Sequence, residues 1–330
     1  MIDTSGLKII FVHGLASKPP KKVLHELWRK AFIANIRVDS TTLAKALEKD
    51  RELFQSAYWA NAIPDHIEDT EDYVKLLNKA VNRVISRRRT LGNKMHISKS
   101  GWVKAKAEKF GLSMVNALGT ALTIKDDVIV NFMREVRYYR NDQYIADRIR
   151  GELETLIRKA WDNRQKIILI THSMGTFIAY DVLWRFSHRS ENDYQDYRKN
   201  RIDYFVTMGS PLGDEKLRNF MLIERWKNAP RSATKTERQR FFPLNIRKWH
   251  NYSAYGDVVC HDSTLEDDFF TGMKTNISGY RTGDLMDYTK LYNPYTRPDG
   301  DENPHKSYGY LVQPKLSQKF QEVMSQWQAL

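Results

Sequence analysis

The chain has 330 residues, 41% of them apolar and 12% aromatic, which is enough to bury a sizeable core in one large domain or two modest ones. A mean hydropathy of −0.60 argues against a membrane-embedded chain, and no apolar run approaches the roughly 20 residues that a spanning helix needs. The single cysteine, Cys260, allows no internal disulfide and no cysteine-built zinc site. We therefore expect a reducing, cytoplasmic location.

Positive charge dominates the composition, with 53 Lys and Arg against 40 Asp and Glu and a net charge of +13. Two stretches hold the excess: residues 83–109 carry nine basic residues against one acidic, and residues 216–248 carry ten against two. Such an excess favours anionic partners, which include nucleic acid, anionic lipid headgroups and acidic substrates.

Strand and helix patterns alternate along the chain. The first half begins with a buried strand at Leu7–Val12, a helix with apolar residues spaced from Val23 to Phe32, and a strand at Ser56–Ala60. The second half continues with a helix over Ile145–Ala160, strands at Lys166–Ile170, Ile202–Met208 and Asn251–Tyr255, and helices over Gly175–Phe186 and Pro314–Trp327. This alternation predicts an α/β fold with a mainly parallel sheet and helices on both faces.

One long segment interrupts the alternation. Residues 67–141 are far longer than a crossover connection needs, and their basic cluster is followed by an apolar stretch. We expect residues 1–66 and 142–330 to form the core and 67–141 to form a helical, basic cap or lid, with 214–247 as a segment that could join it. In such a cap, basic residues would meet anionic headgroups of a membrane, while Trp102, Phe110, Leu112 and Met114 would cover the crevice or touch acyl chains.

The strand Lys166–Ile170 leads into Thr171-His172-Ser173-Met174-Gly175, followed by a helical pattern. A nucleophile elbow has this arrangement, because a serine on a strained strand-to-helix turn needs small residues two positions before and after it. The motif alone occurs often by chance, and an ordinary turn with a capping serine is the alternative. Only Ser173 and Ser307 have glycine two residues later, and of these only Ser173 follows a buried strand.

His13 and Gly14 directly follow the first strand, where glycine permits a sharp turn that aims a backbone N–H into the crevice. Ester hydrolysis by a serine needs donors directed at the developing oxyanion, each worth about 2.7–4 kcal/mol. We expect these donors to be the backbone N–H groups of Leu15 and Met174.

Taken together, these segments resemble the lipase and serine-esterase branch of the α/β-hydrolase superfamily. The resembling residues are Val12-His13-Gly14-Leu15, Thr171-His172-Ser173-Met174-Gly175 and Met208-Gly209-Ser210-Pro211-Leu212-Gly213. Two features differ from the usual family pattern. Thr171 stands where glycine is usual, and the chain starts at what corresponds to the third strand of the family, without the early antiparallel strands.

The resemblance implies the chain order serine, acid, histidine. It assigns His305, in the polar loop before the last helix, as the base. His250 and His261 are the other late histidines, of which His250 is more readily structural and His261 lies too close to Asp257. Asp257, at the end of a strand, is favoured as the acid, and Asp262 is its rival.

These assignments predict a serine hydrolase of carboxylic esters, with lipid-like substrates favoured and no metal or organic cofactor. The resemblance also places His13, Gly14, His172, Ser210, Pro211 and Leu212 around the substrate.

A soluble esterase or thioesterase for small acyl groups is the main alternative, and amide hydrolysis by the same triad stays open. A catalytically degenerate hydrolase that serves as a binding module is a further alternative, whereas nucleic-acid binding is disfavoured because no recognised binding motif with interleaved aromatics is present. Peripheral contact with an anionic membrane is the remaining partner expectation.

Overall fold

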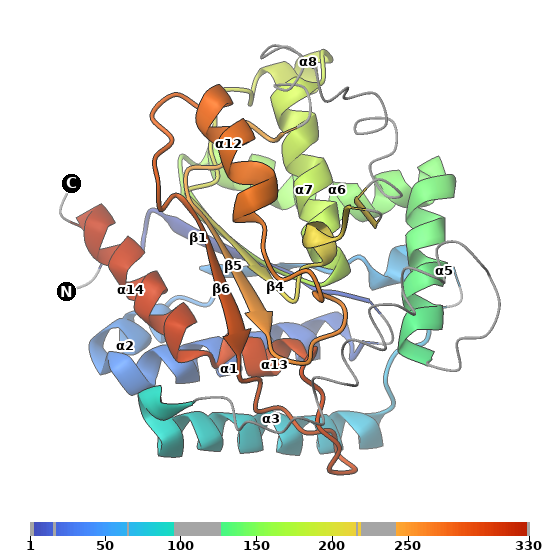
Figure 1. Cartoon of the computed structure of the whole chain (residues 1–330), viewed down its shortest axis with the longest axis vertical. Helices are drawn as coiled ribbons and strands as arrows, with labels where there is room; N and C mark the ends of the chain where they lie inside the picture. Colours follow the sequence, from blue (N-terminus) through green and yellow to red (C-terminus); the bar gives the residue numbers. More distant parts are fainter. Residues whose placement is uncertain are drawn as a thin grey trace.

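A six-stranded parallel sheet forms the centre of the computed structural model, which describes residues 3–15, 18–64, 66–95, 127–215, 217–218 and 242–328 (Figure 1). The spatial order is β2-β1-β3-β4-β5-β6, and each neighbouring pair runs parallel. The strands are β1 (Leu7–Val12), β2 (Phe54–Ala57), β3 (Lys166–His172), β4 (Tyr204–Met208), β5 (Trp249–Ala254) and β6 (Leu285–Leu291). The predicted α/β class with a mainly parallel sheet is therefore confirmed.

Helices cover both faces of this sheet (Figure 1). One layer contains α1 (Lys21–Asp39), α2 (Thr41–Lys49), α3 (Glu71–Leu91), α13 (Ser307–Leu311) and α14 (Pro314–Gln328). The opposite layer contains α5 (Asp127–Asn141), α6 (Gln143–Asp162), α7 (Met174–His188) and α12 (Glu266–Asn276). Shorter elements are α8 (Asn192–Gln195) and the 3₁₀ turns Ala60–Ala62, Gly92–Lys94 and Pro211–Gly213. No helix in the described part of the chain is long and apolar enough to cross a bilayer.

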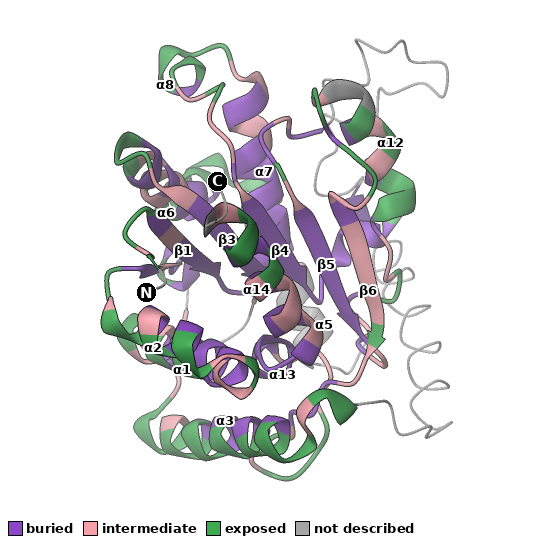
Figure 2. Ribbon diagram, turned by 90° about the vertical axis from the view of Figure 1, so that its left-hand side faces the viewer, coloured by how far each residue is buried: buried purple, intermediate pink, exposed green. Residues whose placement is uncertain are grey.

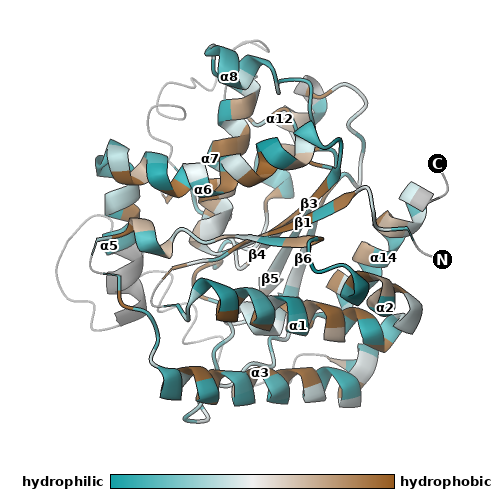
Figure 3. Ribbon diagram, turned by 180° about the vertical axis from the view of Figure 1, so that it is seen from behind, coloured by the Kyte–Doolittle hydropathy of each residue, from teal (hydrophilic) through white to brown (hydrophobic). Residues whose placement is uncertain are grey.

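The strands β1, β3 and β4 are mainly apolar on both sides, because each side of the sheet is covered by helices. Successive side chains of a strand point to opposite faces. In β3, Ile167 and Leu169 pack into the cluster under α6 and α7, while Ile168 and Ile170 pack into the cluster under α1 and α14. All four are fully buried, and each such side chain stabilises the fold by about 1.5–3 kcal/mol relative to exposure. Figure 2 shows this burial along the central strands, and Figure 3 shows the hydrophobic character of β1 and β3.

The strand register brings the carboxyl ends of four strands to one edge. Val12 of β1 pairs with Thr171, His172 of β3 pairs with Met208, and Met208 of β4 pairs with Tyr252. The loops that follow these strands therefore start side by side. In open parallel sheets, this carboxyl edge is where ligands bind.

The structure corrects several predicted boundaries. The second strand is Phe54–Ala57 rather than Ser56–Ala60, and the fourth begins at Tyr204 because Ile202 forms only an isolated bridge with Ile246. The edge strand β6 is absent from the sequence prediction. Its central residues, such as Asp287 and Lys290, are polar and only partly buried or exposed, so the strand lacks an apolar run.

The predicted cap segment begins with a helix that belongs to the layer outside α1. In α3, Leu77, Val81 and Val84 are buried in the same cluster as α1. Arg88 Nε donates to Asn35 Oδ1 at 2.6 Å, which fastens the end of α3 to α1. Residues 96–126 and 219–241, with Trp102, Phe110, Leu112 and Met114, lie outside the described residues. The cap and its membrane contact stay predictions.

Candidate active site

Ser173 lies on a sharp turn between β3 and α7. Its backbone has φ 54° and ψ −129°, a left-handed conformation that costs a non-glycine residue about 1–3 kcal/mol. Neighbouring hydrogen bonds hold this turn: Ser173 N–H donates to Met208 O at 3.0 Å, and Thr176 N–H donates to Ser173 O at 2.9 Å. The predicted strand–turn–helix arrangement of an elbow is present.

Two glycines let the neighbouring backbones approach this turn. A Cβ on Gly175 would lie 2.5 Å from His13 O, and a Cβ on Gly14 would lie 2.7 Å from Ser173 Cβ. Neither position can carry a side chain without moving the backbone. Thr171, where the family usually has glycine, fits because its hydroxyl donates to Val206 O at 3.0 Å in the adjacent strand.

Three side chains from separate loops form one hydrogen-bonded row. His305 Nε2 lies 2.9 Å from Ser173 Oγ, and His305 Nδ1 lies 2.9 Å from both Oδ1 and Oδ2 of Asp257. With the Nδ1–H donating to the carboxylate, Nε2 has a free lone pair that accepts the serine O–H. This is the arrangement in which an imidazole can take a proton from a hydroxyl.

The Asp257 carboxylate is fully buried behind the histidine. Burial alone would raise its pKa, but the nearby His305 and hydrogen bonds to the carboxylate outweigh burial and hold the pKa of Asp257 below its usual value. These bonds include donation by Tyr310 O–H to Oδ2 at 2.5 Å and by Val259 N–H to Oδ1 at 3.0 Å. The carboxylate is thus kept ionised at the position where it orients His305.

Gly209 closes the other side of the carboxylate. It has φ +55°, and a Cβ there would lie 2.8 Å from Asp257 Oδ2 and 3.1 Å from His305 Nδ1. Only glycine tolerates this conformation at this distance. Gly209 belongs to the Gly-Ser-Pro-Leu segment of the resemblance, but sequence reasoning assigned it no role.

His172 points at the histidine loop. Its Nε2–H donates to the backbone carbonyl of His305 at 2.6 Å, and the two rings lie 4.6 Å apart. Burial and the neighbouring His305 hold the pKa of His172 well below the usual range, so this imidazole is neutral. Its position indicates support of His305, whereas the predicted contact with substrate stays untested.

The loop after β1 holds the first expected oxyanion donor. His13 Nε2 accepts from Trp59 N–H at 3.1 Å, so its Nδ1–H donates to Gly14 O at 2.7 Å. Trp59 also stacks on the His13 ring, with centroids 4.7 Å apart. These contacts fix the backbone that leads to Leu15. His13 is buried under this loop, where it orders the backbone.

Met174 holds the second expected donor. It is the first residue of α7, so its N–H is one of those that a helix leaves without an intrahelical acceptor. The positive end of the helix dipole adds to the attraction for a negative oxygen beside Ser173.

The predicted substrate residues Ser210, Pro211 and Leu212 are packed in the interior. Leu212 is fully buried in the cluster under α7. Ser210 Oγ accepts from Leu212 N–H at 3.2 Å and lies 3.1 Å from Thr176 Oγ1, which ties the turn after β4 to α7. In this structure these side chains support Gly209 and the elbow.

The rival acid and bases lie elsewhere. His250 is buried in β5 against Tyr204 O–H, and burial lowers its pKa to about 3. His261 pairs with Asp214 at 3.2 Å, and hydrogen bonding to this carboxylate raises its pKa. Asp262 is exposed. None of the three has a hydrogen bond with Ser173 or His305.

Three residues at the site escaped sequence reasoning. Tyr310 holds Asp257, and Lys18 and Lys306 lie on the loops that carry Leu15 and His305. Tyr310 follows His305 by five residues, a spacing that signals nothing by itself. The lysines differ in no local pattern from the many other basic residues of the chain.

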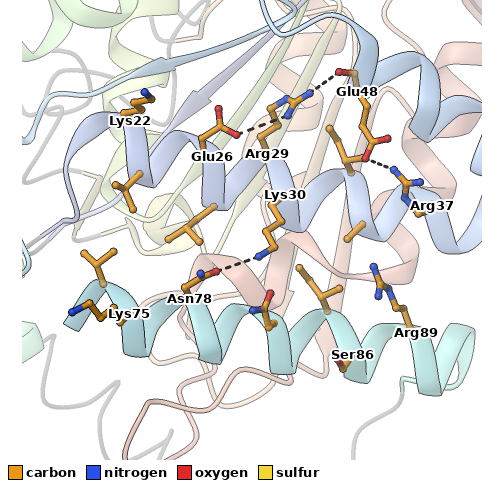
Figure 4. A pocket seen from close by; sticks show the side chains of 17 residues that line it. Lys22, Glu26, Arg29, Lys30, Arg37, Glu48, Lys75, Asn78, Ser86 and Arg89 are labelled. Atoms are coloured by element: carbon orange, nitrogen blue, oxygen red, sulfur yellow. Dashed lines mark hydrogen bonds and ion pairs between the residues drawn. The ribbon is translucent and has the colours of Figure 1, made fainter. Parts of the chain in front are cut away.

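A pocket of about 1080 Å³ lies between α1 and α3, away from these residues (Figure 4). Its floor is apolar, its rim includes Lys22 and Arg89, and Lys30 reaches across it to Asn78 at 3.2 Å. None of its lining residues is a candidate site residue. Among the described residues, no group of three His, Cys, Asp or Glu side chains is placed to hold a metal ion.

Comparison of the chain with protein-family models, curated proteins and solved structures finds no match. The parallel six-stranded α/β fold is compatible with an α/β-hydrolase. The function therefore has to be inferred from the site itself.

Proposed function

We propose that the chain is a serine hydrolase that cleaves carboxylic esters. The observation that carries this proposal is the 2.9 Å contact between Ser173 Oγ and His305 Nε2, backed by the buried Asp257 on His305 Nδ1. A structural serine would not require a strained backbone, and a structural histidine would not require a buried carboxylate behind it. Together they activate a nucleophile.

The first half of the reaction forms an acyl-enzyme. Ser173 Oγ attacks the ester carbonyl carbon while its proton moves to His305 Nε2. The carbonyl oxygen becomes an oxyanion, which the N–H groups of Leu15 and Met174 stabilise. The C–O bond to the alcohol then breaks, and His305 returns the proton to the departing oxygen.

The second half releases the acid. A water molecule gives a proton to His305 Nε2 and attacks the acyl carbon. As the tetrahedral intermediate collapses, the bond between the acyl carbon and Ser173 Oγ breaks, and His305 returns the proton to Oγ. Asp257 remains ionised throughout, orienting the ring and stabilising the imidazolium.

A fluorophosphonate probe tests the nucleophile directly. We expect the wild type to be labelled on Ser173, as located by peptide mass spectrometry, and Ser173→Ala to be neither labelled nor active on p-nitrophenyl hexanoate. Ser317→Ala is the matched control, because Ser317 in α14 is an equally buried serine whose hydroxyl contacts Gln321 and no histidine in the described residues. Labelling of another residue, or undiminished activity of Ser173→Ala, would contradict the proposal.

The substrate class is the second part of the proposal. Lipid-like esters follow from the lipase-like motifs, and small acyl esters or thioesters use the same triad. A p-nitrophenyl series from acetate to palmitate separates them. Preference for long chains supports a lipid-like substrate, and preference for acetate supports a small-acyl esterase. The complete hydrogen-bonded row counts against a catalytically degenerate scaffold.

A further inference from the structure

Two lysines border the candidate active site from separate loops. Lys306 directly follows His305 in the chain. Lys18 lies three residues after Leu15, and its ammonium donates to the Leu15 carbonyl. Both side chains are half-buried. One lysine therefore follows the predicted base in the chain, and the ammonium of the other contacts the residue of a predicted oxyanion donor.

The Lys306 ammonium has no ion pair and no hydrogen bond with another described residue. Its contact is the Tyr308 ring, whose centroid lies 5.9 Å from Nζ. Its backbone is fixed, because Asn293 Nδ2 donates to the carbonyls of Pro304 at 2.6 Å and Lys306 at 3.0 Å. Partial removal of an ammonium from water costs free energy unless a negative group compensates. The loop nevertheless has a fixed backbone at the residue that carries this cation.

The two lysines act on each other. Burial and the charge of Lys306 lower the pKa of Lys18 to about 7, even though Glu135 and Asp69 oppose this. Burial likewise lowers the pKa of Lys306, and the main opposing charge is again Asp69. Asp69 is held in place through its N–H, which donates to Lys18 O at 3.0 Å. The charge of Asp69 thus acts on the pKa of both lysines.

We propose that Lys18 and Lys306 bind an anionic group of the ester substrate, a carboxylate or a phosphate, so that the site cleaves anionic esters in preference to neutral esters of the same size. This inference rests on the proposed serine hydrolase. The ammonium of Lys306, whose backbone is held by Asn293, supplies a donor for the anion beside the scissile bond. A bound anion also removes the repulsion between the two cations, which gives the substrate an interaction that a neutral ester lacks.

Matched esters test the preference. Mono-p-nitrophenyl adipate and p-nitrophenyl hexanoate have the same leaving group and chain length and differ in a terminal carboxylate. A second pair, 4-carboxyphenyl hexanoate and its methyl ester, places the anion on the leaving group. We expect the wild type to favour the anionic member of at least one pair by about tenfold in kcat/KM, the size of one charge-assisted hydrogen bond.

Charge variants locate the preference. We expect Lys306→Gln to lower the anionic-to-neutral ratio about tenfold and Lys306→Arg to retain most of it. Lys49→Gln removes the same charge from the end of α2, just before β2 begins and so at the opposite edge of the sheet, and should leave the ratio unchanged. Thermal unfolding of each variant verifies that it is folded.

The experiments distinguish a failure of this inference from a failure of the hydrolase proposal. Equal rates on both members of each pair, with Ser173-dependent cleavage, overturn the anion preference alone. If neither ester is cleaved, calorimetry of Ser173→Ala with monomethyl adipate tests anion binding independently of hydrolysis. Binding that Lys306→Gln abolishes supports the anion site, and absence of binding overturns it.

Discussion

His172 donates its Nε2–H to the backbone carbonyl of His305 at 2.6 Å, so the residue before the predicted nucleophile holds the loop that carries the predicted base. The rings of the two histidines lie only 4.6 Å apart. A charged His172 would repel the proton that His305 takes up during the reaction. Its lowered pKa, caused mainly by burial, avoids this repulsion.

Loss of this donor should impair the chemical step. In His172→Leu the carbonyl of His305 loses its hydrogen bond and the imidazole its fixed position, and a displacement near 1 Å can cost about 100-fold in rate. We expect kcat to fall about 10- to 100-fold with KM little changed. His172→Gln, whose amide N–H can reach a similar point, should recover part of the loss. Equal kcat values for both variants would show that the hydrogen bond does not position His305.

Tyr310→Phe should reduce the stability that the ionised Asp257 carboxylate contributes at neutral pH. Asp257 has a lowered pKa in the folded state, so it contributes stability that is present above its ordinary value of about 4 and is lost as pH falls through the folded value. Without the Tyr310 donor the folded pKa rises, and this contribution shrinks. We expect urea unfolding to show a loss of about 1–2 kcal/mol at pH 7 and a smaller difference from wild type near pH 3. A difference independent of pH would assign the effect to packing.

Gly209→Ala should abolish ester hydrolysis through a steric clash at the site, in addition to the stability that any alanine loses at a positive φ. The new methyl would lie 2.8 Å from Asp257 Oδ2 and 3.1 Å from His305 Nδ1. Gly92→Ala is the control, because Gly92 has a similar φ of +52° and no atom within 4 Å of its Cβ position. We expect both variants to lose about 1 kcal/mol or more in stability and only Gly209→Ala to lose ester hydrolysis. Comparable activity in the two variants would contradict the close approach.

The preference for anionic esters should depend on pH. The pKa of Lys18 is about 7, so Lys18 is charged below that pH and loses its charge above it. We expect the ratio of kcat/KM for the adipate and hexanoate esters to fall as pH rises from 6 to 8.5. Groups of the chemical step affect both esters and cancel in this ratio. Lys18→Arg, which stays protonated, should keep the ratio flat.

Other titratable groups face Lys18 and are the remaining candidates for such a change. They come from the loop after β1, the segment before α3, strand β3, helix α5 and the loop before α13: His13, His66, Asp69, His172, Glu135 and Lys306. A pH dependence that persists in Lys18→Arg would assign the titration to one of these groups.

Local patterns in the sequence were sufficient for the α/β fold, whereas the choice of site residues also needed the family resemblance. Runs such as Leu7–Val12 and Lys166–Ile170 predicted buried strands because both faces of a parallel sheet are covered. The small residues around Ser173 predicted a tight turn for steric reasons that act within a few residues. His305 and Asp257 were selected by chain order, and the structure brings both within hydrogen-bonding distance of each other.

What the tertiary structure alone decided is which distant side chains meet. Tyr310 and Gly209 enclose the Asp257 carboxylate, His172 holds the loop of His305, and the charge of Lys306 acts on Lys18. No residue pattern near these positions encodes such contacts, since they arise where loops from separate strands converge at the carboxyl edge of the sheet. Local sequence determines strands and turns through short-range sterics and burial, whereas the desolvation and pairing of charges depend on neighbours that only the strand order brings together.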